Sequence, residues 1–312
     1  MGARHLIKAQ VNLNNMYNSE WVGNFYRLFF NDDVDKRNEG CRLLQENRPK
    51  IFCKYLKPKY AEQFIKNQAH WFAHPKIYSD KFDGRWYRFP ISESYNEEER
   101  RIVTEFQNLS INDEKNVLRS TLKLCSFTTN PLNPDMWCNY ADNSKGICVE
   151  YDATWNKTWW GYSQPYLYER LYPMIYLGEP ADLSDFVVNG DNEGWTHPVN
   201  GRMFLWYFGI LISLLKSSEY HVEDEWRAFF FEPFIGNPMY DEDEDEVVDP
   251  KEYGVYYPDY TNPKNIYLGE NIEDNLKKDI LKYTNYLCTN LYQVNNVEGK
   301  LLCTLLPNPE TS

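Results

Sequence analysis

The chain has 312 residues and a formal net charge of −13, so a general basic surface for nucleic acid is not expected. Aromatic residues make up 17% of it, including 25 tyrosines, which excludes a disordered composition. This length can bury a substantial core as one large domain or two modest ones. The seven cysteines include no CxxC pair, and a zinc ribbon or dithiol redox motif therefore has no support.

Two features bear on location. The first fifteen residues lack the long apolar stretch of a secretory signal, and Leu6 stands where a myristoylation signal needs a hydroxyl residue. The longest apolar run, residues 203–215, is too short to span a bilayer. A cytoplasmic protein without a membrane partner is expected.

The first half of the chain begins with a predicted helical extension, residues 1–48, in which Ser19 is a suitable N-cap for an apolar, helically spaced run. The rest, residues 49–312, is predicted to form the main domain. Its first elements are expected as a strand over 50–56, a helix over 58–68, a strand over 69–75, a charged helical region over 95–122, and strands over 123–129 and 146–152.

The second half is rich in predicted strands. Strands are expected within 165–177 and over 221–233, 265–269, 290–296 and 300–307, and helices over 201–217 and 270–284. The run DEDEDE lies within residues 237–254, and mutual repulsion of its charges predicts a solvated acidic loop there. It lacks the ligand spacing of an EF-hand.

These elements interleave irregularly, which predicts an α+β fold with a split, twisted mixed β-sheet and flanking helices. A doubly wound parallel sheet would alternate strands and helices regularly. No GxGxxG motif follows the first strand and no GxxxxGKS motif occurs. The sequence therefore lacks the main motifs of two common nucleotide-binding folds.

The segment HVEDEWR, residues 221–227, holds the most distinctive acidic pattern. In a strand, alternate residues share a face, so Glu223, Glu225 and Arg227 are predicted to point the same way. Two neighbouring carboxylates can be driven to different protonation states and can then divide acid–base and electrostatic roles. A carboxylate also suits glycosidic cleavage through an oxocarbenium-like state. The alternative is that Arg227 neutralises one glutamate in an ordinary ion-pair cluster.

Metal chemistry has a weaker basis. His70 and His74 are four residues apart, but the intervening residues do not match HExxH and the segment is predicted as a strand. A metal-dependent hydrolase that uses Asp83, Glu223 and Glu225 stays open as an alternative.

Several motifs, in this order, resemble the bacterial domain of unknown function family 2971 over about residues 50–305. They are KY (54–55), WFAHP…FDG (71–84), CSF…MWCNYADNSKGICVEYD (125–152), LLKSSEYHVEDEWR (214–227), IYLG (266–269) and LYQV (291–294). The chain departs from the family pattern at Leu56, where the family has arginine, and also at His74, Asp135 and Asn139.

The layout of that family is similar to the ADP-ribosyltransferase fold, which holds NAD in the cleft of a split sheet. The resemblance implies that Glu225 stabilises the oxocarbenium ion and that Glu223 helps the acceptor nucleophile. It implies that Trp137 and Tyr140, three residues apart in a helical turn, face the nicotinamide together and that Lys145 meets phosphate. The cofactor-binding residues expected on this basis are Lys54, Tyr55, Ser126, Trp137, Tyr140, Lys145 and Arg227.

The expected function is therefore that of an NAD-consuming ADP-ribosyltransferase-like enzyme, a bacterial toxin or anti-phage defence effector that acts on protein or nucleic acid. The absence of the family's arginine after Tyr55 keeps a second interpretation open, a nucleotide- or partner-binding module without catalysis.

Overall fold

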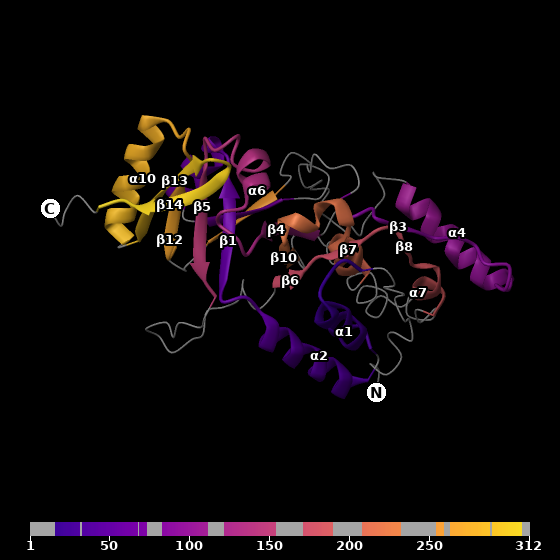
Figure 1. Cartoon of the computed structure of the whole chain (residues 1–312). Helices are drawn as coiled ribbons and strands as arrows, with labels where there is room; N and C mark the ends of the chain where they lie inside the picture. The colour runs from indigo at the N-terminus through magenta and orange to yellow at the C-terminus, as the bar shows by residue number, and fades with distance from the viewer. Residues whose placement is uncertain are drawn as a thin grey trace, which may run out of the picture.

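The computed structural model describes residues 16–31, 33–67, 69–73, 83–111, 122–153, 171–189, 208–231, 254–258, 263–287 and 289–307. Helices and strands interleave in an α+β arrangement, as predicted (Figure 1). The strands do not form one sheet, because the described residues contain two five-stranded and two two-stranded sheets. None of the described helices is long and apolar enough to cross a membrane.

The first large sheet carries the C-terminal elements. Its strands, in spatial order, are β1 (Ile51–Leu56), β5 (Ile147–Asp152), β12 (Asn265–Leu268), β13 (Asn290–Val297) and β14 (Lys300–Leu305). All neighbours are antiparallel except β12 and β13. Parallel neighbours need a crossover, which is supplied by α10 (Asp274–Leu287). Helix α3 (Pro58–Asn67) packs against α10.

The second large sheet brings together segments from the whole chain. Its strands, in spatial order, are β11 (Gly254–Pro258), β2 (Ala69–Ala73), β4 (Leu122–Phe127), β10 (Trp226–Phe231) and β6 (Leu171–Pro173). Two small parallel pairs complete the strands, β3 (Tyr87–Arg88) with β8 (Ala181–Asp182) and β7 (Ile175–Leu177) with β9 (Leu215–Ser217).

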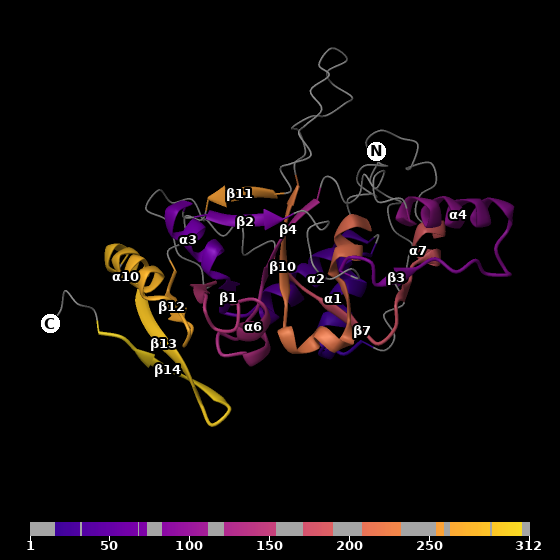
Figure 2. The ribbon, with the colours of Figure 1, turned by 90° about the horizontal axis from the view of Figure 1, so that it is seen from above.

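The two large sheets are joined at one backbone bridge. Cys53 of β1 and Thr128, which follows β4, exchange N–H···O bonds of 2.7 and 2.9 Å. Strand β4 of the second sheet therefore lies next to β1, the edge strand of the first (Figure 2). This junction is where charged side chains gather.

The predicted N-terminal helices form as α1 (Glu20–Phe29), which begins after Ser19, and α2 (Val34–Asn47). Helix α1 is part of the common core. Trp21 stacks on Trp226 of β10 with ring centroids 6.1 Å apart, and the Tyr26 hydroxyl donates a hydrogen bond to the carbonyl oxygen of Pro173. A domain boundary near residue 48 remains a prediction.

Several predicted boundaries were wrong. Of the charged helical region predicted over 95–122, the described part is α4 (Glu97–Ile111), residues 112–121 lie outside the described residues, and Leu122 belongs to β4. Residues 165–177 supply two strands, β6 and β7, in different sheets. The predicted helix over 201–217 is helical at 208–214 and then becomes β9, because residues 215–217 pair with β7. Helix α7 (Ser184–Asn189) was not predicted. The acidic loop, apart from Gly254, and His74 lie outside the described residues.

Gly146 ends the polar turn between α6 (Pro134–Asn139) and β5, and a side chain there has no room. A Cβ atom at this position would lie 2.0 Å from the carbonyl oxygen of Leu56, a backbone atom that cannot swing away. Gly146→Ala is therefore expected to lower the free energy of unfolding by about 1–3 kcal/mol in urea titrations. Gly23→Ala in α1, where the nearest atom is 3.4 Å away, is the matched control. Equal stability of the two variants would contradict this account.

Candidate functional site

A pocket of about 100 Å³ lies at the junction of the two large sheets. Its charged lining residues are Lys54, Asp83, Lys216, Glu223 and Glu225. Its other lining residues are Cys53, Tyr55, Ser126, Phe127, Met136 and Tyr140. These side chains come from segments far apart in the sequence, so the pocket exists only in the folded chain.

The segment that carries both glutamates is not the strand that its alternation predicted. Residues 218–223 form a 3₁₀ helix, η3 (Ser218–Glu223), and Asp224 is left-handed with φ 44° and ψ 51°. The strand begins only at Trp226. The carbonyl oxygens of Val222 and Glu223 accept hydrogen bonds from the side chains of Asn133 and Thr128, at 2.6 and 2.7 Å. These contacts fix η3 and the turn at its end, so a continuous strand is excluded.

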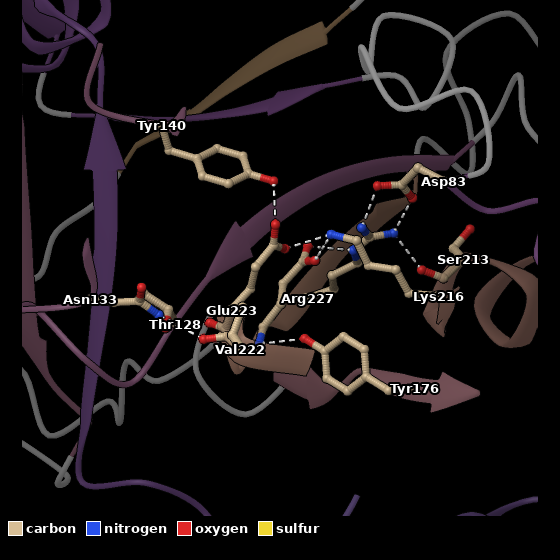
Figure 3. A network of polar contacts seen from close by, with 11 residues as sticks. Asp83, Thr128, Asn133, Tyr140, Tyr176, Ser213, Lys216, Val222, Glu223 and Arg227 are labelled. Atoms are coloured by element: carbon tan, nitrogen blue, oxygen red, sulfur yellow. Dashed lines mark hydrogen bonds and ion pairs between the residues drawn. The ribbon is translucent and has the colours of Figure 1, made fainter. Parts of the chain in front are cut away.

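The two carboxylates nevertheless meet at one cation, Lys216 of β9. Its Nζ donates to Glu223 Oε2 at 2.6 Å and to Glu225 Oε2 at 2.9 Å (Figure 3). All three residues are buried. The other oxygen of Glu223 accepts a hydrogen bond of 2.9 Å from the hydroxyl of Tyr140.

Arg227 lies behind Glu225, away from the pocket. Its Nε donates to Glu225 Oε1 at 2.7 Å, and its two terminal nitrogens donate to the two oxygens of Asp83 at 2.6 Å each. The same guanidinium also donates to the carbonyl oxygen of Ser213 at 2.6 Å. Arg227 is 1% exposed, so its role is to hold Glu225 and Asp83 in place.

The pKa values of the two glutamates shift in opposite directions, within the same ion-pair cluster that includes Arg227. Burial raises the pKa of Glu223, and the opposing effects of Lys216 and Tyr140 do not cancel it. Burial also acts on Glu225, but the charges of Arg227 and Lys216 outweigh it and hold the pKa of Glu225 below its usual range. These shifts favour the ionised form of Glu225 and make Glu223 the easier of the two to protonate.

The walls of the pocket are aromatic and apolar. Tyr55 is fixed by its hydroxyl, which donates to Asn130 O at 2.9 Å and accepts from Asn133 N at 3.2 Å. Tyr140, 39% exposed, stands at the rim. Phe127 and Met136 are buried in the wall. Such surroundings keep water away from the carboxylates and strengthen electrostatic effects inside the pocket.

The structure brings most of the predicted site residues together. Lys54, Tyr55, Ser126, Tyr140, Glu223 and Glu225 all line the pocket. Arg227, expected to bind cofactor, is instead buried behind Glu225.

Two other predicted site residues lie elsewhere. Trp137 is 1% exposed and lies behind the pocket wall, in a hydrophobic cluster that includes the lining residues Tyr55 and Met136. Its ring packs edge-to-face on Tyr55, and its N–H donates to Pro131 O at 2.9 Å. Tyr140 lines the pocket and Trp137 does not, so the two side chains do not face it together. Lys145 is exposed, pairs with Asp142 at 3.5 Å, and does not line the pocket.

Sequence reasoning missed Lys216, which joins the two carboxylates. A signal existed, because this lysine directly follows the apolar run of residues 203–215. A lysine is almost never fully buried without a partner, so a buried one predicts nearby carboxylates. Asp83 was considered only as a metal ligand.

The alternative of a metal-dependent hydrolase is not favoured by this arrangement. Lys216 and Arg227 already engage the oxygens of Asp83, Glu223 and Glu225. Within the described ranges, no group of three or more histidine, cysteine, aspartate or glutamate side chains is arranged to hold a metal ion. His70 packs its ring against Phe127 and Tyr151.

No family model matches the chain, and no curated protein sequence or solved structure matches it. The resemblance to the bacterial family described above stays a prediction.

Proposed function

We propose that this protein is an ADP-ribosyltransferase-like enzyme that cleaves the bond between nicotinamide and ribose in NAD. The observation that carries the proposal is the buried ion-pair cluster at the pocket, in which carboxylates outnumber their cations. Among the ion pairs described above, Asp83, Glu223 and Glu225 share two cations, Lys216 and Arg227.

This excess of negative charge suits a positively charged ligand. When all five side chains are ionised, the cluster carries one uncompensated negative charge in a buried place, which is costly. The cluster can lose that charge by protonating Glu223, or it can keep it and bind a cation. The pyridinium ring of NAD and the oxocarbenium ion formed from its ribose both carry the required positive charge.

The proposed step assigns a separate role to each glutamate. The glycosidic bond breaks and its electron pair leaves with nicotinamide, which becomes neutral. The ribose takes up the positive charge, and the ionised Glu225, held by Arg227 and Lys216, stabilises it. An acceptor nucleophile forms the new bond to the same carbon and gives its proton to Glu223. With water as the acceptor, the products are nicotinamide and ADP-ribose.

The proposed acceptor is a protein or nucleic acid, which would make the protein a toxin or anti-phage effector. Tyr140, which is 39% exposed at the rim, donates a hydrogen bond from its hydroxyl to Glu223, and this contact supports the assignment of Glu223 to the acceptor. The aromatic wall behind the carboxylates would restrict the competing reaction with water.

Glu225→Gln is expected to reduce nicotinamide release from NAD by about 100-fold or more, because an amide keeps the shape but loses the charge that stabilises the transition state. Release is measured chromatographically on purified protein, with candidate acceptors added. Lys145→Met, a surface lysine outside the pocket, is the control and should retain the wild-type rate. Circular dichroism and urea titration establish that each variant is folded.

Three results would redirect the assignment. Equal nicotinamide release by the wild type and Glu225→Gln would remove Glu225 from catalysis. A rise in melting temperature with NAD and no product from the wild type would favour a binding module. Activity that disappears with EDTA and returns with a divalent metal would favour the hydrolase.

A further inference from the structure

Lys54 is the second cation of the pocket, and it is bound differently from Lys216. Its Nζ donates to the carbonyl oxygen of Ser126 at 2.7 Å and lies 5.5 Å from the ring centroid of Phe127. Lys216, in contrast, contacts two carboxylates. Within the part of the chain that the structure describes, Lys54 has no carboxylate at ion-pair distance.

The ammonium group of Lys54 therefore keeps donor capacity for a ligand. A lysine has three N–H donors, and a neutral carbonyl oxygen uses one of them without balancing the charge. Lys54 is half-buried and lines the pocket, so its remaining donors are partly shielded from water. An anionic group bound there would make a charge-assisted hydrogen bond in surroundings where such bonds are strong.

The two ends of the pocket have opposite charges and are connected through one residue. The carbonyl oxygen of Ser126 accepts from Lys54, and the side chain of Ser126 contributes to the lowered pKa of Glu225. The backbone of Ser126 is itself fixed, because β4 pairs there with Arg227 of β10. Lys54 at the positive end and Glu225 at the negative end are thus both positioned next to Ser126 of β4.

We propose that the pocket selects a dipolar ligand, with a positively charged ring at Glu223 and Glu225 and a phosphate group at Lys54. This inference rests on the function proposed above and specifies its substrate class. In NAD the phosphate closest to the pyridinium ring is the one on the nicotinamide ribose. Nicotinamide mononucleotide is then the smallest ligand that satisfies both ends. The phosphate role thereby moves to Lys54 from Lys145, which is exposed and bonded to Asp142.

The test compares two ligands that differ only in the phosphate, nicotinamide mononucleotide and nicotinamide riboside. Their binding to wild-type protein, Lys54→Met, Lys54→Arg and Lys145→Met is measured by titration calorimetry, with nicotinamide release from NAD followed in parallel. The wild type is expected to bind the mononucleotide about tenfold or more tightly than the riboside. Lys54→Met should lose this preference, while Lys54→Arg and Lys145→Met should keep it.

The outcomes separate this inference from the proposed function. If the wild type releases nicotinamide from NAD but binds the riboside as tightly as the mononucleotide, the phosphate site is wrong and the enzyme assignment stands. If folded Lys54→Met still prefers the mononucleotide, Lys54 is not the phosphate-binding residue. If neither ligand binds and NAD is not cleaved, both proposals fail.

Discussion

Replacing Lys216 with methionine is expected to lower the free energy of unfolding by about 3–5 kcal/mol at pH 8. Methionine fills a similar volume, so the main loss is the charge that lies 2.6 Å from Glu223 and 2.9 Å from Glu225. Glu225 keeps Arg227 as a partner. Glu223 keeps only the hydroxyl of Tyr140 among the side-chain donors described above, and it becomes a buried carboxylate without a cation.

The loss from Lys216→Met should depend on pH in a defined direction. Without the lysine, the pKa of Glu223 rises further above its ordinary value of 4.5. Between 4.5 and that raised pKa, the folded state binds a proton that the unfolded state has released. The free energy of unfolding therefore falls as pH increases through this window, by up to about 1.4 kcal/mol per pKa unit. Glu225 acts in the opposite sense, because its pKa is lowered and its stabilisation is lost only as pH falls below 4.5.

Urea titrations at pH 5 and pH 8 on the wild type, Lys216→Met and Lys216→Met/Glu223→Gln measure this effect. The double variant should recover part of the stability at pH 8, because the amide needs no cation. Lys145→Met, the same substitution at an exposed ion pair, should change stability by less than about 0.5 kcal/mol. A Lys216→Met deficit that is the same at both pH values would refute the proposed link to Glu223.

Arg227→Met should lower the free energy of unfolding by a similar amount, about 3–5 kcal/mol. The guanidinium makes a bidentate pair with Asp83, contacts Glu225 and donates to Ser213 O, all in a site where the arginine is 1% exposed. Its removal leaves two buried carboxylates without their common partner. Asp83→Asn in the same chain should restore part of the loss, since one of the two charges is then absent.

Arg101 provides a matched control, because it also contacts two carboxylates, those of Glu98 and Glu105. It lies on the exposed face of α4, where water competes for the same groups, and Arg101→Met should cost far less stability than Arg227→Met. Equal losses in the two arginine variants, measured by urea unfolding at one pH, would show that burial does not set the strength of the Arg227 cluster.

Much of the secondary structure followed from local patterns. The apolar spacing after Ser19 predicted α1, and the strands β1, β4 and β5 lie close to where their apolar runs indicated. The strand prediction for HVEDEWR was wrong. Its alternation is typical of a strand, but hydrogen bonds from Thr128 and Asn133 hold η3 and the left-handed Asp224 in place. The alternation of side-chain types within one segment cannot predict the hydrogen bonds that other segments make to it.

The amino-acid sequence by itself determined the α+β class, most of the strands and helices, and the presence of two glutamates two residues apart in HVEDEWR. The tertiary structure alone decided that Lys216 joins these glutamates, that Arg227 turns toward Asp83, and that Trp137 packs behind the pocket wall. The reason is physical: spacing along a chain shows which side chains are buried together on one element. The partner of a buried charge is determined only when distant elements pack together. Asp83, for example, lies 144 residues from Arg227 in the sequence.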